Sequence, residues 1–293
     1  MKLRRYIIIT PARNEGPHLR ETIESVQSQT IRPSRWIIVD DGSSDETGRI
    51  ADDAARAHDW INVVHRPDRG YRKSGGGVIE AFYEGYRLVE NESWDYVVKL
   101  DADLSFAPAF FEQCFNQFEI DPALGIGGGA VCLKTDGKLQ VEASGDPPFH
   151  VRGATKIYRR CCWNEIGGLL RETGWDTLDE IKANMLGWKT RTFNEQFLIH
   201  HRGTGTADGV WKNWVKNGRA NYIVGYHPLF MFCKCAARLF EAPFGVVSAG
   251  LWYGFVSGYL LRVPRNLEPD VIQYLRREQM RRLLFRTSIW AVR

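Results

Sequence analysis

Hydrophobic and polar residues form two kinds of segment along the first hundred positions. Short apolar runs rich in β-branched residues, which are typical of buried strands, are separated by segments whose apolar residues share one helical face. The expected strands are 6–9, 36–39, 61–66 and 95–100, and the expected helices are 13–30, 46–59 and 75–89. Strands that alternate with helices predict an α/β fold with a mainly parallel sheet and helices on both of its faces.

The pattern changes after the fourth expected strand. From residue 104 to about residue 160, stretches rich in glycine and proline predict strands connected by turns. A helix is then expected from about Asp176 to residue 186, with Asp176 or Thr177 as its amino-terminal cap. Gly187 is expected to end this helix, because glycine adopts the left-handed conformation that follows a last helical turn.

These patterns divide the chain into a main domain and a C-terminal region. The main domain is expected at 1–222, with halves of about 1–105 and 106–222, and a helical, apolar and basic region at 223–293. The main domain is long enough to enclose a sizeable hydrophobic core.

The C-terminal region contains a candidate membrane segment. Residues 242–261 are twenty consecutive uncharged residues, about the minimum for a membrane-spanning helix, but glycines, a proline and serines interrupt them. Basic stretches on both sides suit an anionic membrane surface, which predicts peripheral membrane contact through about 226–293. Two other arrangements stay open, in which the segment packs on the protein itself or spans the membrane.

Composition restricts the class of protein only moderately. A net charge of +4 is too small to indicate a nucleic acid as partner. The six cysteines lack the paired C-x-x-C spacing of a zinc site, and the first residues lack the apolar core of a secretory signal. We therefore expect reduced thiols and a cytoplasmic location, at the inner face of the membrane if the C-terminal region binds lipid.

Acidic residues directly follow two of the expected strands. Asp40 and Asp41 follow the second strand, and Asp101 and Asp103 follow the fourth. Because ligands of parallel sheets bind beyond the carboxyl ends of the strands, both pairs are candidate binding residues. Two carboxylates that point the same way repel each other unless a cation lies between them, and Mg²⁺ or Mn²⁺ carrying a diphosphate supplies that cation. A solvated loop or a helix cap is the ordinary alternative for such residues.

A basic loop precedes the third expected helix. It carries Arg66, Arg69, Arg72 and Lys73 ahead of three glycines. Cations beside bare backbone N–H groups suit a phosphate, although the loop matches neither the dinucleotide fingerprint nor the P-loop pattern. We therefore expect Arg72 and Lys73 to contact a phosphorylated ligand.

The order of these motifs is more informative than any one of them. "PARNE" at 11–15, "IIVDDGSSDET" at 37–47, the basic loop and "VVKLDADLSF" at 97–106 together resemble the nucleotide-sugar-binding half of family 2 glycosyltransferases. The segment from Arg152 to Trp188 continues the resemblance, which covers about residues 5–205. It implies the GT-A fold and an inverting, metal-assisted transfer of a sugar from a nucleotide diphosphate to an acceptor hydroxyl.

The resemblance also implies roles for matching positions. Asp103 would ligate Mg²⁺ or Mn²⁺, and Asp101 would face the ribose and diphosphate of the donor. A late histidine or arginine often reaches the diphosphate or metal in this family, which implies Arg202 and, as a metal ligand, His201. His200 stays an alternative to His201. The remaining residues expected to bind the nucleotide sugar are Pro11, Ala12, Arg13, Asn14, Glu15, Asp40, Asp41 and Ala102.

The resemblance places the general base near the start of the late helix. The family has a Glu-Asp pair before the glycine that ends this helix, and the position of its Asp is Asp176 here. The position of the Glu is Trp175, and this departure leaves Asp179 and Glu180 as rivals one turn later. A single carboxylate suffices, because an inverting transfer needs one base for the acceptor hydroxyl and no covalent intermediate.

Two other functions are compatible with parts of this pattern. One is a non-catalytic, membrane-associated protein that binds a nucleotide sugar. The other is a phosphotransferase of the haloacid dehalogenase type, which also has D-x-D after a strand but near its amino terminus and with a different continuation from Leu104-Ser105. The donor sugar, its base and the acceptor stay open, and the apolar C-terminal stretch suggests a lipid-linked or envelope glycan as acceptor.

Overall fold

The computed structural model describes residues 4–71, 76–135, 137–142, 145–171, 173–202, 209–265 and 268–290. The chain forms two compact units, Met1–Arg202 and Gly203–Arg293.

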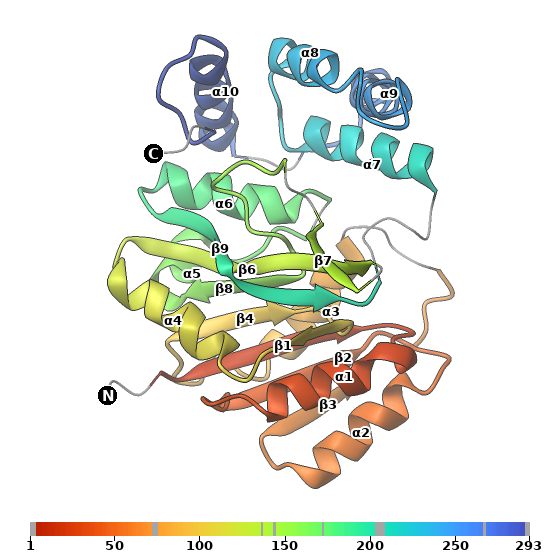
Figure 1. Ribbon diagram of the computed structural model, residues 1–293, viewed down its shortest axis with the longest axis vertical. Coiled ribbons are helices and arrows are strands. Elements are labelled where there is room, and N and C mark those ends of the chain that lie inside the picture. The colour runs from red at the N-terminus through yellow and green to blue at the C-terminus, as the bar shows by residue number, and fades with distance from the viewer. Residues whose placement is uncertain are drawn as a thin grey trace. The chain divides into compact units, whose positions relative to one another are not determined.

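Strands and helices alternate along the first hundred residues of the first unit (Figure 1). Every strand and helix expected in the first hundred residues is present. The elements of this unit are β1 (Tyr6–Ala12), α1 (Gly16–Gln27), β2 (Arg35–Asp40), α2 (Thr47–Ala57), β3 (Ile61–His65), α3 (Gly76–Tyr86), β4 (Tyr96–Leu100), β5 (Leu104–Phe106), α4 (Phe110–Ile120), β6 (Leu124–Thr135), β7 (Lys138–Val141), β8 (Thr155–Arg159), α5 (Arg160–Ile166), α6 (Trp175–Met185) and β9 (Lys189–His200).

The strands of the described residues form one nine-stranded mixed sheet, in the order β3-β2-β1-β4-β8-β6-β9-β5 with β7 paired to β6. The first four strands of this order are parallel, so the ends of β1, β2 and β4 lie at one edge. At the other side of the sheet β5 pairs antiparallel with β9, which sets Leu104 opposite His200. This pairing brings the end of β9 to the D-x-D segment, and the predicted α/β sheet is confirmed.

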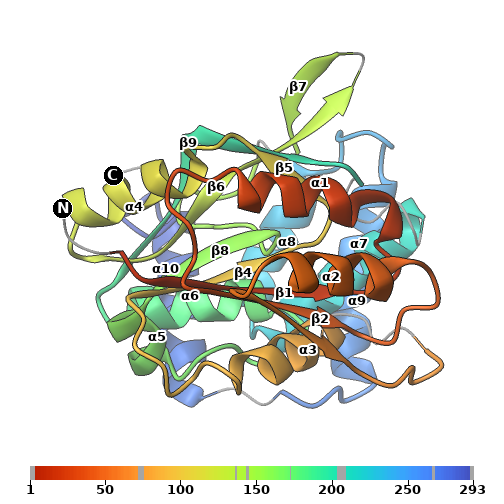
Figure 2. The ribbon, with the colours of Figure 1, turned by 90° about the horizontal axis from the view of Figure 1, so that it is seen from below.

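Two helical layers cover this sheet because successive side chains of a strand point to opposite faces. Ile8 and Ile38 pack in a core with α1, α2 and α4, whereas Ile7 and Ile37 pack in a second core with α3, α5 and α6. Figure 2 shows the two layers on opposite sides of the strands, and the hairpin of β6 and β7 projecting from the sheet. The continuous apolar runs of the strands follow from this burial on both faces.

The glycine-rich segment that starts at Gly125 forms the interior of β6 and not a turn. A methyl group on Gly127 would overlap the ring of Phe193, and one on Gly128 would overlap the carbonyl oxygen of Thr155. The glycines are therefore required where β6 packs closely against neighbouring backbone and rings.

Replacing Gly128 with alanine is expected to lower the free energy of unfolding by about 1–3 kcal/mol. The obstructing atom belongs to the backbone of Thr155, so no flexible side chain can move away from the new methyl group. Urea denaturation measures this effect. Gly145→Ala is the matched control, because its methyl group meets no described atom within 4 Å, and it should change stability by less than about 0.5 kcal/mol. Equal stabilities of the two variants would contradict this packing.

The second unit contains four helices among its described residues, α7 (Val210–Ile223), α8 (Pro228–Ala237), α9 (Val246–Leu260) and α10 (Pro269–Leu283). Residue 222, where the sequence pattern places the domain boundary, lies in the last turn of α7. No helix of the described chain has both the length and the apolar character needed to cross a membrane.

Glycines explain how α9 packs within this unit. A methyl group on Gly254 would overlap the carbonyl oxygen of Val215, and one on Gly218 would overlap that of Leu251. The glycines of α9 at positions 250, 254 and 258 thus share the side that approaches α7. The small residues that interrupt the uncharged run are explained by this close packing of two helices, which is one of the three arrangements left open by the sequence.

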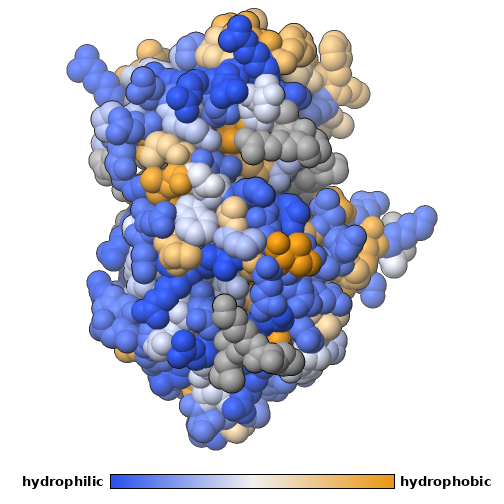
Figure 3. Space-filling model, turned by 90° about the vertical axis from the view of Figure 1, so that its left-hand side faces the viewer, coloured by the Kyte–Doolittle hydropathy of each residue, from blue (hydrophilic) through white to orange (hydrophobic). Residues whose placement is uncertain are grey.

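Large apolar side chains are nevertheless exposed in the second unit. Phe240 and Phe244, between α8 and α9, are 84% and 75% exposed, and Leu260 at the end of α9 is 77% exposed. Hydrophilic residues cover most of the face shown in Figure 3, where apolar residues form separate groups. The side chains of Phe240, Phe244 and Leu260 leave apolar surface exposed on the segment between α8 and α9 and at the end of α9.

Candidate functional site

Asp101 follows β4 and is paired with a buried lysine. The Lys99 ammonium, in a side chain that is 2% exposed, contacts the Asp101 carboxylate and donates to the carbonyl oxygen of Gly153. Burial raises the pKa of Asp101, and Asp103 raises it further, while Lys99 opposes the change. Sequence reasoning missed this lysine, although a charged residue inside an otherwise apolar strand was a signal for it.

Asp103 lies between two cationic side chains. Its Oδ2 is 3.3 Å from Nε2 of His200 and 3.6 Å from a guanidinium nitrogen of Arg202. Burial would raise the pKa of Asp103, but the hydrogen bond and charge of His200, together with Arg202, lower it below its ordinary value. Asp103 is therefore an ionised carboxylate at neutral pH.

His200 is held between two carboxylates. Its Nδ1 is 3.1 Å from Oε2 of Glu142, and its Nε2 faces Asp103. Burial disfavours the imidazolium, but hydrogen bonds to Asp103 and Glu142 outweigh it and raise the pKa of His200 to about 10. His200 is therefore the histidine that lies against the Asp103 carboxylate.

The expectation that His201 is a metal ligand stays a prediction, and its side chain has partners other than the Asp103 carboxylate. Its backbone N–H donates to the carbonyl oxygen of Asp103, but its Nε2 lies 2.8 Å from Oε2 of Glu21 and 2.9 Å from the hydroxyl of Ser105. Successive residues at the end of a strand point to opposite sides, so His200 and not His201 reaches the Asp103 carboxylate.

Glu15 joins the ends of β1 and β9. One carboxylate oxygen pairs with Arg202, the other, Oε2, is buried and has no hydrogen-bond partner among the described residues, and the side chain is nearly buried. Burial, reinforced by Asp103, raises the pKa of Glu15 to about 7 against the opposing charge of Arg202. Arg202, which pairs with Glu15, also contacts Asp103. The buried Oε2 without a partner therefore lies near Asp103 and is suited to accept a hydrogen bond from a ligand.

Asp40 and Asp41 lie at the end of β2 and have different partners. Asp40 accepts from the backbone N–H of Ser43 at 3.0 Å and lies 3.0 Å from Nδ1 of His65. Asp41 contacts the guanidinium groups of Arg66 and Arg69. Burial raises the pKa of Asp41, and the arginines oppose this change. The structure therefore brings the basic loop onto the second acidic strand end.

The other expected donor-binding residues line the same edge. Pro11 and Ala12 are the last residues of β1, in register with Val39 and Asp40. Arg13 donates to the carbonyl oxygen of Asp41 at 2.9 Å. The carbonyl side chain of Asn14 accepts from the backbone N–H of Ser44, and Ala102 is buried with its carbonyl bonded to Thr22. Arg72 and Lys73 lie outside the described residues.

Asp176 lies in the first turn of α6 and is half-buried. The predicted cap is wrong, because Gly174 precedes the helix and no side chain caps it, whereas Gly187 with φ of +93° ends it as predicted. A methyl group on Gly153 would lie 3.6 Å from Cβ of Asp176, and the carbonyl of Gly153 accepts from Lys99. Asp176 and Lys99 therefore share Gly153 as a neighbour.

Asp179 and Glu180 have interior positions instead. Asp179 accepts from Lys156 at 2.9 Å and from the hydroxyl of Tyr158 at 2.6 Å, and Glu180 lies 2.7 Å from Lys156 and 2.9 Å from His150. Burial raises the pKa of Asp179 to about 6, although Lys156 opposes the change. The carboxylates of Asp179 and Glu180 are both bound by side chains of a buried cluster. Among the described residues, no side chain forms a hydrogen bond or ion pair with the Asp176 carboxylate.

A divalent cation fits the residues around Asp103. Mg²⁺ and Mn²⁺ take hard oxygen ligands, and Asp103 is held ionised by His200 and Arg202, which both contact its Oδ2. The unpartnered Oε2 of Glu15 is a second oxygen at this edge. Asp103 would hold the ion, and Glu15 and Asp101 would surround it.

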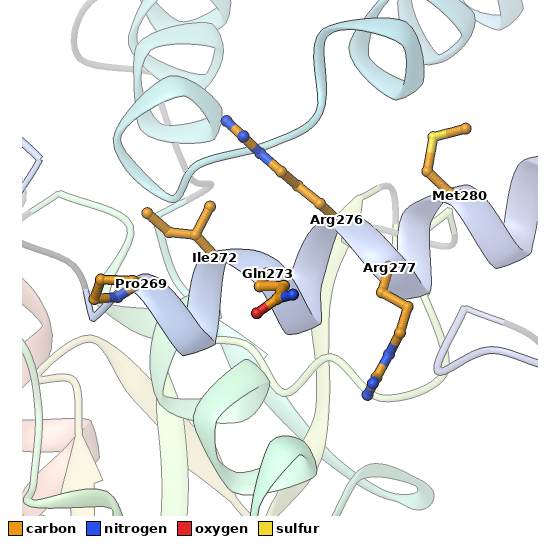
Figure 4. A pocket seen from close by; sticks show the side chains of 6 residues that line it. All are labelled: Pro269, Ile272, Gln273, Arg276, Arg277 and Met280. Atoms are coloured by element: carbon orange, nitrogen blue, oxygen red, sulfur yellow. The ribbon is translucent and has the colours of Figure 1, made fainter.

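A separate hollow occurs in the second unit. It has a volume of about 520 Å³ and is lined by residues of α10, which Figure 4 shows pointing from successive turns: Pro269, Ile272, Gln273, Arg276, Arg277 and Met280. It contains no carboxylate among these residues and therefore does not resemble the acidic strand ends.

Comparison with known proteins agrees with the motif order. The family model for "Glycosyl transferase family 2" matches residues 7–169. A poly-beta-1,6-N-acetyl-D-glucosamine synthase of Staphylococcus epidermidis is 25% identical over 271 residues, which cover 84% of this chain and 62% of that protein. The chain thus spans about three fifths of that relative's length.

Solved structures share the fold. A mannosyltransferase from Pyrobaculum calidifontis in complex with GDP-Man and Mn²⁺ has a TM-score of 0.57 at 18% identity, over 98% of this chain and 77% of that one. TarS of S. aureus, residues 1–349 in complex with UDP-GlcNAc, has a TM-score of 0.53 at 14% identity, over 92% of this chain and 79% of that one. The expected GT-A fold is confirmed.

Proposed function

The chain belongs to glycosyl transferase family 2, and on this premise we propose that it transfers a sugar from a nucleotide-diphosphate donor to an acceptor hydroxyl with inversion at the anomeric carbon. The observation that carries the proposal is the convergence of Glu15, Asp103 and Arg202 from three segments of the sheet edge. Family membership removes the alternative of a haloacid-dehalogenase-type phosphotransferase.

Donor binding is assigned to the ends of β1, β2 and β4. Asp40 and Asp41 accept hydrogen bonds from the base or ribose, to which Arg13 donates, and Asp101 and the unpartnered oxygen of Glu15 accept hydrogen bonds from hydroxyl groups nearby. Arg202 binds the diphosphate, since a guanidinium presents paired donors to phosphate oxygens. Mg²⁺ or Mn²⁺, when bound at Asp103, supplies the positive charge that the leaving diphosphate requires.

Asp176 is the proposed general base. It is half-buried at the start of α6 and neighbours Gly153, whose carbonyl oxygen accepts from Lys99, so its carboxylate is suited to an acceptor hydroxyl beside the Lys99–Asp101 pair. Asp179 is less suited to this role because Lys156 and Tyr158 already bind its oxygens in the interior. Lys156 also donates to the backbone carbonyl of Asp176, which ties the buried cluster to the position of the base.

Metal-dependent binding of a nucleotide sugar tests this function. Isothermal titration with UDP-, GDP- and dTDP-sugars is expected to detect at least one donor in the presence of Mn²⁺, and Asp103→Asn should weaken its binding by at least about 10-fold. The matched control is Glu165→Gln, an exposed carboxylate on α5 that accepts from Trp188.

The outcomes separate the candidate functions. If no donor binds with either Mg²⁺ or Mn²⁺, the proposal is overturned. If a donor binds but is neither hydrolysed nor transferred, the non-catalytic nucleotide-sugar-binding protein is favoured. Binding that is unchanged in Asp103→Asn would remove Asp103 from the metal site.

We further propose that the second unit contacts an anionic membrane at the inner face of the cell membrane, which would bring a lipid-linked or envelope glycan acceptor to the enzyme. Support comes from the exposed Phe240 and Phe244, together with exposed arginines of α10 such as Arg277 and Arg281. A unit that exposes both apolar rings and cations suits a lipid interface.

Vesicle sedimentation tests this contact. The protein is expected to bind phosphatidylglycerol vesicles and not phosphatidylcholine vesicles, and Phe240→Ser combined with Phe244→Ser should weaken binding by at least about 10-fold. Ile120→Ser is the control, since Ile120 is 76% exposed in the first unit. A wild-type protein that ignores both kinds of vesicle would disprove membrane contact.

A further inference from the structure

A second group of metal-binding side chains lies on α1 and at the end of β9. It consists of His18, Glu21 and His201, whose ligand atoms all lie within 4.8 Å of one another. Oε2 of Glu21 is 2.8 Å from Nε2 of His201, and the rings of His18 and His201 stack with centroids 5.6 Å apart. His18 and Glu21 are three residues apart on α1 and therefore share one helical face.

The backbone on both sides of this group is already fixed. The hydroxyl of Thr22, next to Glu21, donates to the carbonyl oxygens of Ala102 and Leu104 at 2.8 Å and accepts from the N–H of Leu104 at 3.0 Å. The N–H of His201 donates to the carbonyl oxygen of Asp103 at 3.0 Å. The backbone positions beside Glu21 and at His201 are therefore held by hydrogen bonds to the D-x-D segment.

The donor set differs from that of the D-x-D segment. Two imidazoles and one carboxylate are ligands of Zn²⁺, Co²⁺ or Ni²⁺, and three protein ligands with an open fourth position are a known zinc arrangement. Mg²⁺ prefers oxygen ligands alone. The Asp103 carboxylate contacts His200 and Arg202, and neither of these residues belongs to the group of His18, Glu21 and His201.

We propose that His18, Glu21 and His201 form a transition-metal site of the zinc class, separate from the divalent-cation site at Asp103. An ion here connects α1 to His201, which lies between His200 and Arg202 in the sequence. It thereby holds these two cations against Asp103 and Glu15, and its role is to position the end of β9.

Titration with Zn²⁺ and with Co²⁺ tests this site without any assay of activity. The full chain, freed of metal with a chelator, is expected to bind one Zn²⁺, and Co²⁺ should give visible absorption bands of a low-coordinate nitrogen-and-oxygen site. Glu21→Gln, at a side chain that is 50% exposed, and His18→Ala should each weaken Zn²⁺ binding by at least about 10-fold.

Two controls separate this site from other sources of zinc binding. His58→Ala removes a histidine that follows α2 and lies outside the group, and it should leave the affinity unchanged. Asp103→Asn should also leave it unchanged. The proposal is overturned if Glu21→Gln and His18→Ala both bind Zn²⁺ like the wild type, or if Asp103→Asn abolishes the binding.

Discussion

Asp176→Asn is expected to lower kcat by about 10²–10⁴-fold while leaving donor affinity unchanged, because it removes only the group that accepts the proton of the acceptor hydroxyl. The amide has the size of the carboxylate but cannot act as a base at neutral pH. Its contacts with the remainder of α6 should persist, since no side-chain bond of Asp176 stabilises the helix start among the described contacts. Steady-state kinetics and donor titration on the same preparation measure the two quantities.

The control for this variant and its rival are both available in the chain. Glu165→Gln makes the same chemical change at an exposed carboxylate and should retain kcat. Asp179→Asn tests the other candidate, with its folding checked by circular dichroism. If Asp176→Asn keeps its activity and a folded Asp179→Asn loses it, the general base is Asp179.

Lys156→Met is expected to lower the free energy of unfolding by about 3–5 kcal/mol near neutral pH. The Lys156 side chain is fully buried, and its ammonium lies 2.9 Å from Asp179 and 2.7 Å from Glu180, whose side chains are fully buried as well. Methionine fills a similar volume but leaves two buried carboxylates without their cation. Urea denaturation at pH 8 measures the loss.

The loss should be smaller at pH 5 than at pH 8. Burial already raises the pKa of Asp179 to about 6 in the wild type, and without Lys156 it rises further. A carboxyl group whose pKa is raised by folding binds a proton more readily in the folded state, so its favourable contribution is present at low pH and disappears as the pH rises through that pKa. Protonation of Asp179 at pH 5 therefore removes an unpaired buried charge and reduces the loss of stability in Lys156→Met.

Lys189→Met is the matched control for this effect. Lys189 pairs with Asp121 at 2.8 Å, but its side chain is 56% exposed, so the loss should stay below about 1 kcal/mol at either pH. A Lys156→Met protein that is as stable as Lys189→Met at pH 8 would show that the buried cluster does not depend on its cation.

The local pattern was sufficient for the elements of the first hundred residues and for their acidic ends. β-Branched runs and helical periodicity are properties of neighbouring residues, and they located β1 to β4 and α1 to α3. Parallel strands then place the residues after β1, β2 and β4 at one edge of the sheet. The sequence alone therefore predicts that Asp41 and Asp103 lie near the same binding site. The order of the motifs added the family.

The segment after β5 was harder to predict from the sequence. The glycines of β6 resemble turn residues in sequence, but Gly128 is needed because backbone from β8 passes beside it. The uncharged run at 242–261 likewise has the composition of a candidate membrane segment, whereas Gly254 serves the packing of α9 on α7. In each case the glycine's role depends on a partner that is distant along the chain.

By itself the sequence determined the strands, the helices and the family, because these depend on short-range pattern and on motif order. Only the tertiary structure decided which histidine meets Asp103 and which carboxylate of α6 stays available. Those choices depend on contacts such as that of Glu15 with Arg202, 187 residues apart, and on the burial of Asp179 beside Lys156. Side-chain direction and desolvation are set by the elements packed around a residue, and no local pattern specifies them.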